Sequence, residues 1–250
     1  MDIQAVIFDL GGTLVEYAGP YAVWPDLETP GLEAAYVKLQ GKGVGLPSFE
    51  QFSSTGFALL PQRWQMATKG ERNLRLIDFL AEIVEACEVD VVEQAWLVEA
   101  AMLYQDAICG QAEPLDGAQE TLEFVKRQGY RIGLLSNTMF TGSAHIADLK
   151  RFSLDSYFDA MLFSGDVGKW KPSAEPYLDL LHQLDAAPEN GVFIGDDPAN
   201  DMVGGERAGL RTILIRSSQR FQQPAGVNPD AIISNLSELP AVLNSWSNEN

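Results

Sequence analysis

The chain has 250 residues, of which 46% are hydrophobic and 21% are charged, and its formal net charge is −18. This length supplies enough apolar material for one large domain or two smaller ones. So acidic a surface repels nucleic acid and anionic membranes, which we exclude as partners. No apolar run reaches membrane-spanning length, and two cysteines, Cys87 and Cys109, form no metal motif. We therefore expect a cytoplasmic protein with reduced thiols.

The first predicted element is a buried strand close to the N-terminus. Residues 3–8 are mostly apolar, and the run ends at Asp9 shortly before Gly11 and Gly12. Such a run is too short for an ordinary helix and is typical of a central strand in a parallel sheet. Ligands bind beyond the carboxyl ends of such strands, so Asp9 is placed for chemistry. Taken alone, it also fits the start of a turn.

A helical insertion is predicted after this strand. Residues 16–30 contain Gly19, Pro20, Pro25 and Pro30, a composition that is typical of an irregular linker. Leu76 begins a set of apolar residues with the spacing of one helix face, continued by Leu80, Ile83, Val84 and Cys87. A further helix is predicted over residues 90–108. We expect residues 18–110 to form an all-helical cap, joined by linkers near residues 15–20 and 110–116.

Strands and helices alternate in the rest of the chain. Strands are predicted at residues 130–135, 159–163, 192–194, 212–215 and 231–233. One helix is expected to be capped by Asp116 and another to begin at Ser173, while residues 244–250 are expected to fray. This alternation predicts an α/β fold, a Rossmann-like parallel sheet flanked by helices, built from residues 1–17 and 111–250.

Three later segments place polar groups at strand ends. Ser136 and Asn137 follow the second strand, where a hydroxyl can hold a phosphate oxygen or only cap a helix. Lys171 precedes a proline and is interpreted as an anion ligand, whereas Lys169 is interpreted as a solvated lysine. The third segment holds three carboxylates within six residues: Asp196, Asp197 and Asp201. They suit Mg²⁺, although acids also decorate helix N-termini, and a calcium loop would need a Gly and a Glu that are missing.

Together the four segments resemble the haloacid dehalogenase superfamily of hydrolases in residue type and order. The resemblance implies that Asp9 is the nucleophile, forming an aspartyl-phosphate, and that Ser136 and Lys171 hold the phosphoryl oxygens. It implies Mg²⁺ as cofactor, with Asp9, Asp196, Asp201 and the backbone carbonyl of Gly11 as ligands; Asp197 could share the role of Asp201. The implied substrate contacts are Leu10, Gly11, Ser136, Asn137 and Lys171. The implied substrate is a small phosphorylated metabolite, and a monomer is favoured.

One position departs from this resemblance. Phosphatases of the superfamily carry a second Asp two residues after the nucleophile, as general acid and base, and that position here is Gly11. Either another carboxylate replaces it, with Glu16 and Asp197 nearest in sequence, or basic leaving groups react slowly. Gly11 therefore keeps two alternatives open: a non-catalytic phosphate-binding relative and, since dehalogenases also lack this Asp, a 2-haloacid dehalogenase. The acidic cluster favours phosphoryl chemistry.

The cap is expected to select the substrate. Its candidate contacts are Arg63, Trp64, Arg72 and Arg75, although Arg72 and Arg75 are interpreted as a solvated helix face. The tryptophans Trp24, Trp64 and Trp96 are interpreted as cap core rather than as a ligand platform. His145 and His182 are interpreted as ordinary surface or half-buried histidines.

Overall fold

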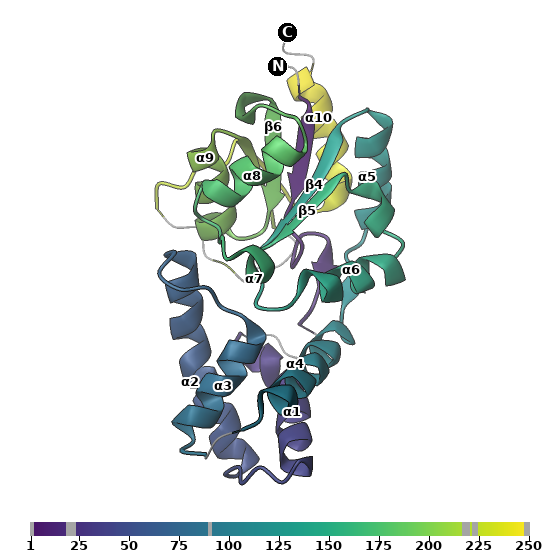
Figure 1. The fold of residues 1–250 in the computed structure, drawn as a ribbon. Helices are drawn as coiled ribbons and strands as arrows, with labels where there is room; N and C mark the ends of the chain where they lie inside the picture. Colours follow the sequence, from purple (N-terminus) through teal and green to yellow (C-terminus); the bar gives the residue numbers. More distant parts are fainter. Residues whose placement is uncertain (1–2, 19–23, 90–91, 217–220, 222–224, 248–250) are drawn as a thin grey trace.

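The computed structural model describes residues 3–18, 24–89, 92–216, 221 and 225–247, which form an α/β part and a helical part (Figure 1). The α/β part holds a six-stranded, all-parallel sheet in the order β5-β4-β1-β6-β7-β8. The strands are β1 (Ala5–Phe8), β4 (Arg131–Ser136), β5 (Ala160–Phe163), β6 (Gly191–Gly195), β7 (Arg211–Ile215) and β8 (Ala231–Ile233). From β1, the strands β4 and β5 are added on one side of the sheet, and β6, β7 and β8 are added on the other. In sheets of this kind, ligands bind beyond the carboxyl ends of the strands at the point where the order reverses, here β4, β1 and β6.

Alternate residues of β1 enter two different hydrophobic cores. Val6 and Phe8 pack in a core with α5 (Ala118–Arg127), α6 (Gly142–Arg151) and α10 (Leu239–Ser247). Ala5 and Ile7 pack on the other face, in a core with α8 (Glu175–Gln183) and α9 (Val203–Ala208). The strand is therefore buried on both faces, which is why its sequence is apolar throughout rather than alternating.

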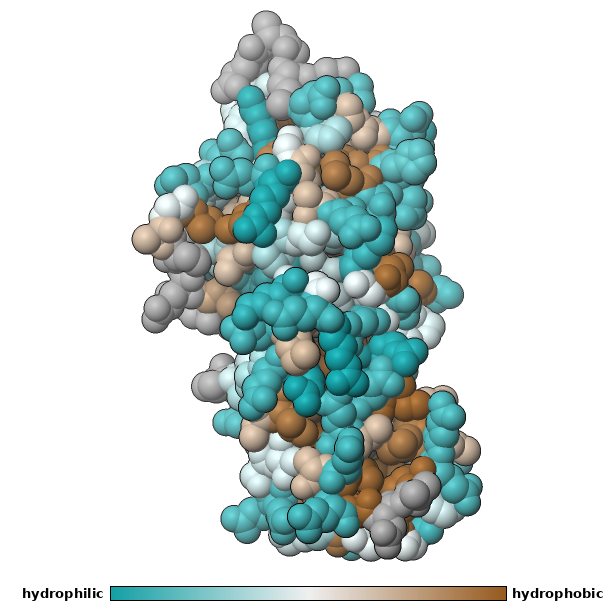
Figure 2. All heavy atoms as spheres, turned by 60° about the vertical axis from the view of Figure 1, so that its left-hand side comes forward, coloured by the Kyte–Doolittle hydropathy of each residue, from teal (hydrophilic) through white to brown (hydrophobic). Residues whose placement is uncertain are grey.

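The helical part contains α1 (Thr29–Gly41), α2 (Phe49–Thr68), α3 (Leu76–Ala86) and α4 (Gln94–Cys109). These helices share a third hydrophobic core, to which Leu80 and Ile83 of the predicted helix face contribute. In Figure 1 they lie beyond the carboxyl ends of the strands, below the sheet. Figure 2 shows one face of the molecule, which is largely hydrophilic over the α/β part and carries more hydrophobic surface over the helical part.

Two short strands lie side by side where the chain passes between the parts. In β2 (Val15–Glu16) and β3 (Glu113–Pro114), Val15 pairs with Pro114 and Glu16 with Glu113 in antiparallel fashion. Close by, the Arg151 guanidinium of α6 donates 2.7 Å to the carbonyl oxygen of Cys109 at the end of α4. Both passages of the chain are therefore fixed to the α/β part by hydrogen bonds.

The predicted fold class is confirmed: a Rossmann-like parallel sheet flanked by helices, with an inserted helical cap. The boundaries at residues 18 and 110 stay a prediction, and part of the first predicted linker, residues 19–23, lies outside the described residues. Both cysteines are free thiols. No described helix combines the length and the apolar character that crossing a lipid bilayer requires.

Some local predictions were wrong, for reasons of backbone geometry. Asp116 does not cap a helix, since Gly117 (φ 81°) precedes α5 without any side-chain cap. The helix expected at Ser173 begins at Glu175, whose N–H donates 3.3 Å to the Ser173 hydroxyl. Residues 244–247 belong to α10 rather than to a frayed tail, because Trp246 packs into the core. The last three residues lie outside the described part.

Candidate functional site

Asp9 lies directly after β1, in a loop shaped by two glycines. Its N–H continues the sheet by donating 2.8 Å to the carbonyl oxygen of Ile194, so its position is fixed by the strand next to it. Gly12 has φ +80°, and a Cβ there would lie 2.2 Å from the Asp196 carboxylate. A glycine is thus required twice over, for the turn and for the approach of the second carboxylate to the loop.

Lys171 joins the carboxylates into one buried cluster. Its Nζ lies 2.5 Å from Asp9 Oδ1 and 2.7 Å from Asp201 Oδ1, and it donates 3.1 Å to the Leu135 carbonyl oxygen. Burial alone would lower the pKa of Lys171, but the charges of Asp201 and Asp9 outweigh burial and raise it. The lysine is therefore a fixed positive charge, 2% exposed, at the ends of β4 and β1.

Asn137 holds the lysine backbone from the end of β4. The Lys171 N–H donates 2.9 Å to Asn137 Oδ1, and Asn137 Nδ2 donates 3.0 Å to the Lys171 carbonyl oxygen. Both polar atoms of this side chain thus serve to position Lys171. The Ser136 hydroxyl lines the same pocket and forms no hydrogen bond with any residue that the structure describes. It is the group best placed to bind an incoming ligand.

The acidic segment after β6 provides the second wall of the cluster. Asp197 Oδ1 accepts hydrogen bonds from the N–H groups of Ala199 and Asn200 at the start of the π-helix Pro198–Met202. Asp201, which follows one turn later, turns back to accept 3.0 Å from the Asp197 N–H. Gly195 permits this return, since a Cβ there would lie 2.2 Å from Asp201 Oδ2.

Three carboxylates form a group suited to a divalent cation. One oxygen each of Asp9, Asp196 and Asp201 lies within 4.8 Å of the others. Asp201 Oδ1 is buried, and its charged partner among the described residues is the Lys171 ammonium at 2.7 Å. Burial and the neighbouring carboxylates raise the pKa of Asp201, and the Lys171 charge offsets this only in part. Three carboxylates exceed the one lysine charge, and such hard oxygen ligands fit Mg²⁺.

The other residues singled out from the sequence either belong to the loop after β1 or lie outside the pocket. Gly11 lines the pocket, whereas the Leu10 side chain is fully buried in the core, so only the Leu10 backbone is available for a substrate contact. Arg72 and Arg75 are exposed and paired with acids, as predicted for a solvated face. Arg63 likewise pairs with Glu82 and does not line the pocket. Lys169 pairs with Glu175 and Asp179, and His182 is exposed.

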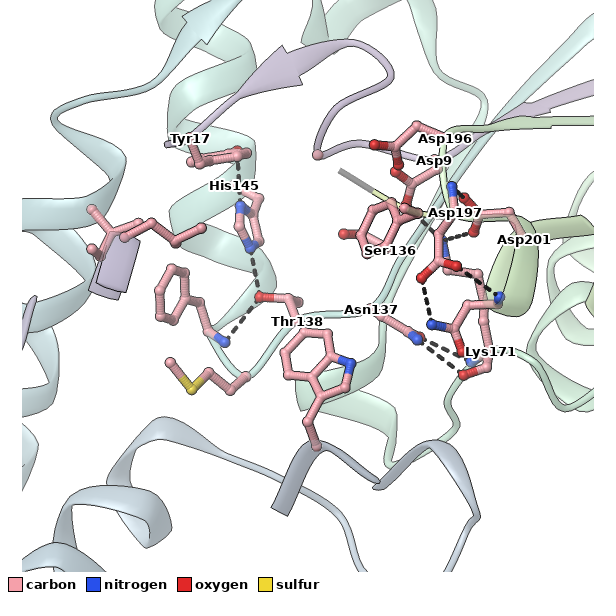
Figure 3. Close-up of a pocket in the computed structure, with 18 of the residues that line it drawn as sticks. Asp9, Tyr17, Ser136, Asn137, Thr138, His145, Lys171, Asp196, Asp197 and Asp201 are labelled. Carbon is pink, nitrogen blue, oxygen red and sulfur yellow. Dashed lines mark hydrogen bonds and ion pairs between the residues drawn. The ribbon is translucent and has the colours of Figure 1, made fainter. Parts of the chain in front are cut away.

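The pocket also has a wall that the sequence did not reveal. A cavity of about 190 Å³ extends from Asp9 to residues of the helical part. In Figure 3, Tyr17, His145 and Thr138 form a hydrogen-bonded row on the side away from the acidic cluster. His145 Nδ1 lies 3.0 Å from the Tyr17 hydroxyl and Nε2 lies 2.8 Å from Thr138 Oγ1. Burial lowers the pKa of His145 to about 4, so the ring is neutral.

Two interpretations from the sequence were wrong here. His145 is 4% exposed and stacked between Phe140 and Phe163, not on the surface, because α6 packs over the end of β5. Trp64 is not simply cap core, since it lines the pocket and packs edge-on against Trp170 of the α/β part. Glu28 lines the pocket as well, and no motif in the sequence indicated it.

The match to a known protein family agrees with this arrangement. The haloacid dehalogenase-like hydrolase family matches residues 3–209. The chain belongs to this family. A pyrophosphatase PpaX of Bacillus mycoides (strain KBAB4) is 32% identical over 132 residues, which cover 52% of this chain and 60% of that protein. The chain thus spans about three fifths of the length of this relative.

Solved structures share the fold of this haloacid dehalogenase-like hydrolase over nearly its whole length. The 2-haloacid dehalogenase from Pseudomonas syringae pv. Tomato DC3000 has a TM-score of 0.69 at 25% identity, covering 98% of this chain and 99% of that one. A predicted phosphoglycolate phosphatase from Haemophilus somnus 129pt has a TM-score of 0.64 at 18% identity, covering 97% and 99%. Relatives with different names therefore share one architecture, and substrate choice must be argued from the site.

Proposed function

We propose that this hydrolase is a Mg²⁺-dependent phosphatase acting on a small phosphorylated metabolite. The observation that carries the proposal is the buried cluster in which Lys171 contacts both Asp9 and Asp201 while Asp196 adds a third carboxylate. Such a set combines a nucleophile, a fixed cation for phosphoryl oxygens and ligands for a metal ion. The names of the PpaX and phosphoglycolate phosphatase relatives point to the same class of substrate.

In this mechanism the Asp9 carboxylate attacks phosphorus, the bond to the leaving oxygen breaks, and water later releases phosphate from the aspartyl-phosphate. Lys171 and the Ser136 hydroxyl stabilise the negative charge of the transferred group, and their buried positions strengthen both interactions. Asp9, Asp196, Asp201 and the Gly11 carbonyl would hold Mg²⁺. When bound, the ion neutralises phosphoryl charge and keeps substrate and carboxylates together.

We also propose that residues 18–110 act as a cap that closes over the pocket and excludes water during turnover. The core shared by α1–α4 supports a helical unit, and it packs against Met139, Phe140 and Trp170 of the α/β part, as a closed cap would. Pocket walls from both parts support closure. The buried ligand cluster would then sit at the interface of the two parts.

Removal of metal is expected to lower hydrolysis of 4-nitrophenyl phosphate at least about 100-fold, since a bound cation stabilises several kcal/mol of transition-state charge. The rate is measured before and after EDTA treatment and again after Mg²⁺ is added back. A second readout is independent of turnover: Mg²⁺ should raise the melting temperature of the apo protein, because binding stabilises the folded state. Full activity in EDTA would contradict the proposal.

The substitution Gly11→Asp is expected to raise turnover of alkyl phosphates by about tenfold or more, the lower end of a general-acid contribution. A Cβ at Gly11 would meet only Tyr17 Cδ2, at 3.8 Å, and φ is not positive, so the loop can accept the side chain. In the wild type the leaving oxygen must depart largely as an anion. Rates should therefore fall steeply as the leaving-group pKa rises, and the variant should flatten this dependence.

The measurement is log kcat/KM against leaving-group pKa for both proteins. Gly45→Asp is the matched control, because Gly45 has open space around it and lies outside the pocket. A shallow slope in the wild type would show that another residue supplies the proton. Of the two carboxylates nearest in sequence, Glu16 accepts hydrogen bonds from the N–H groups of Tyr17 and Ala18 and does not line the pocket. Asp197 does line the pocket and would therefore be substituted next.

A second candidate function is 2-haloacid dehalogenation. Two observations favour it: the name of the Pseudomonas syringae relative and the missing acid at Gly11. Chloride release from 2-chloropropionate without Mg²⁺, in the absence of phosphatase activity, would establish it. Tight phosphate or Mg²⁺ binding with no turnover of any ester would instead identify a non-catalytic relative.

A further inference from the structure

A carboxylate of the helical part faces the pocket that contains the catalytic cluster. Glu28 ends the 3-10 turn Asp26–Glu28, immediately before α1, and is 7% exposed. It lines the cavity that also contains Asp9 and Lys171. The proposed phosphatase mechanism does not use this carboxylate, so its burial requires another explanation.

The Glu28 carboxylate accepts one hydrogen bond from the residues that the structure describes. The Tyr104 hydroxyl, from α4, donates 2.9 Å to Glu28 Oε2. The Tyr104 ring reaches Glu28 across Gly31, where a Cβ would lie 2.4 Å from the ring. The other oxygen, Oε1, has no hydrogen-bond partner among the described residues, and Glu28 lines the pocket.

Within residues 3–18, 24–89, 92–216, 221 and 225–247, no positively charged side chain forms an ion pair with Glu28. Among the residues that the structure describes, no Lys or Arg lies within 4.0 Å of its carboxylate. The basic side chains of the helical part pair elsewhere, Lys38 with Glu99 and Arg72 with Glu82. Consistent with this, burial raises the pKa of Glu28 to about 7 despite the hydrogen bond from Tyr104. The described part of the chain therefore offers this carboxylate the Tyr104 hydroxyl but no cation.

The surroundings of Glu28 suit a positively charged group. Trp64 and Phe140 line the same cavity, and aromatic faces attract cations. An anionic group would be repelled by Glu28 and by the acidic cluster, and a neutral hydroxyl would leave the buried charge uncompensated. An ammonium group would compensate the carboxylate through a charge-assisted hydrogen bond, in a cavity whose aromatic walls tolerate a cation.

We infer that Glu28 is a specificity-determining residue that binds a protonated amine on the organic part of the substrate. The substrate class is then a phosphorylated compound whose organic part carries a protonated amine, with its phosphoryl group at Asp9, Ser136 and Lys171 and its ammonium at Glu28. This inference rests on the proposed phosphatase function and makes it narrower.

The test compares alkyl phosphates that differ only at the far end. Aminoalkyl, hydroxyalkyl and carboxyalkyl phosphates with two to four carbons are assayed with Mg²⁺, and kcat/KM is compared at equal chain length. In the wild type, kcat/KM for at least one aminoalkyl phosphate should be about ten- to a hundredfold higher than for the hydroxyalkyl phosphate of equal chain length. This is the range expected for one charge-assisted hydrogen bond. Its carboxyl partner should be the poorest of the three.

The variant Glu28→Gln keeps the shape and the acceptor for Tyr104 but removes the charge. It should reduce the amine-to-hydroxyl ratio to about one, mainly through the KM of the aminoalkyl phosphate. Glu33→Gln is the matched control, because Glu33 is exposed on α1 and does not line this pocket, and it should keep the wild-type ratio. An equal ratio in the wild type, or a ratio that Glu28→Gln leaves unchanged, would overturn the inference.

A binding measurement separates this inference from the proposed function. Aminoalkyl and hydroxyalkyl phosphonates cannot be hydrolysed, and their dissociation constants are measured by calorimetry in wild type and Glu28→Gln. Absence of turnover for every ester, together with an amine preference that depends on Glu28, would reject the phosphatase and keep the recognition site. Turnover without any amine preference in rate or binding would reject only the recognition site.

Discussion

Asp9→Asn is expected to lower kcat for 4-nitrophenyl phosphate by a factor of about 10⁴ or more, because an amide cannot replace the attacking carboxylate. Asparagine has the same shape and keeps an oxygen near Lys171, so the loop between β1 and β2 should keep its conformation. The measurement is steady-state turnover at saturating Mg²⁺. In parallel, mass spectrometry of acid-quenched wild-type protein should find phosphate on the peptide that contains Asp9.

The control for this substitution is Asp106→Asn, which makes the same chemical change at an exposed position of α4. It should retain wild-type turnover. If Asp9→Asn kept more than a few per cent of the activity, or if the phosphate were found on another residue, Asp9 would not be the nucleophile. The mechanism would then have to begin from a different carboxylate of the cluster.

Lys171→Met is expected to abolish turnover and also to destabilise the fold by about 3–5 kcal/mol, because it leaves two buried carboxylates without their counter-charge. Methionine fills most of the same volume, so the effect reports charge rather than a cavity. Burial already raises the pKa of Asp201 beside Lys171, and the loss of the lysine raises it further. A raised pKa means that the folded state binds more protons, so stability falls as pH rises. The deficit should therefore shrink towards pH 5.

Urea denaturation at pH 5 and pH 8 measures this deficit. Lys169→Met is the matched control, since Lys169 lies two residues away but pairs with Glu175 and Asp179 at the surface. Exposed pairs contribute about 1 kcal/mol or less, so that variant should remain stable and active. A Lys171→Met protein as stable as the wild type at pH 8 would mean that the cluster does not depend on the ammonium charge.

The part of the site that lies at strand ends is predictable from the sequence. Asp9, Ser136 and Asp196 each follow or end an apolar run of strand length, and parallel strands bring their carboxyl ends to one edge. The sequence therefore places these groups together without any knowledge of side-chain packing. The buried contact of Lys171 with Asp201 does not follow from this rule, because Lys171 lies in the loop after α7 (Ser164–Val167) rather than at a strand end.

The wall formed by the helical part is not predictable in this way. Glu28 lies between Pro25 and Pro30, in a segment whose composition is typical of an irregular linker. Its burial depends on Tyr104, which is 76 residues away and has the sequence character of an ordinary core aromatic residue. His145 likewise depends on Tyr17, 128 residues away. Contacts of this kind arise from tertiary packing between elements, and local periodicity carries no information about them.

The pairing of β2 with β3 has a consequence for how this architecture can change. Val15 pairs with Pro114 and Glu16 pairs with Glu113, so the segment between β2 and β3 begins and ends at one antiparallel strand pair. The entropy of closing a loop depends only weakly on its length, and the ladder already holds the two ends together. The register of the parallel sheet therefore does not depend on the length of the segment between β2 and β3, although Trp64 of that segment packs against Trp170. Recombination could replace the whole helical segment with a longer, shorter or unrelated one and leave the register of the six strands intact.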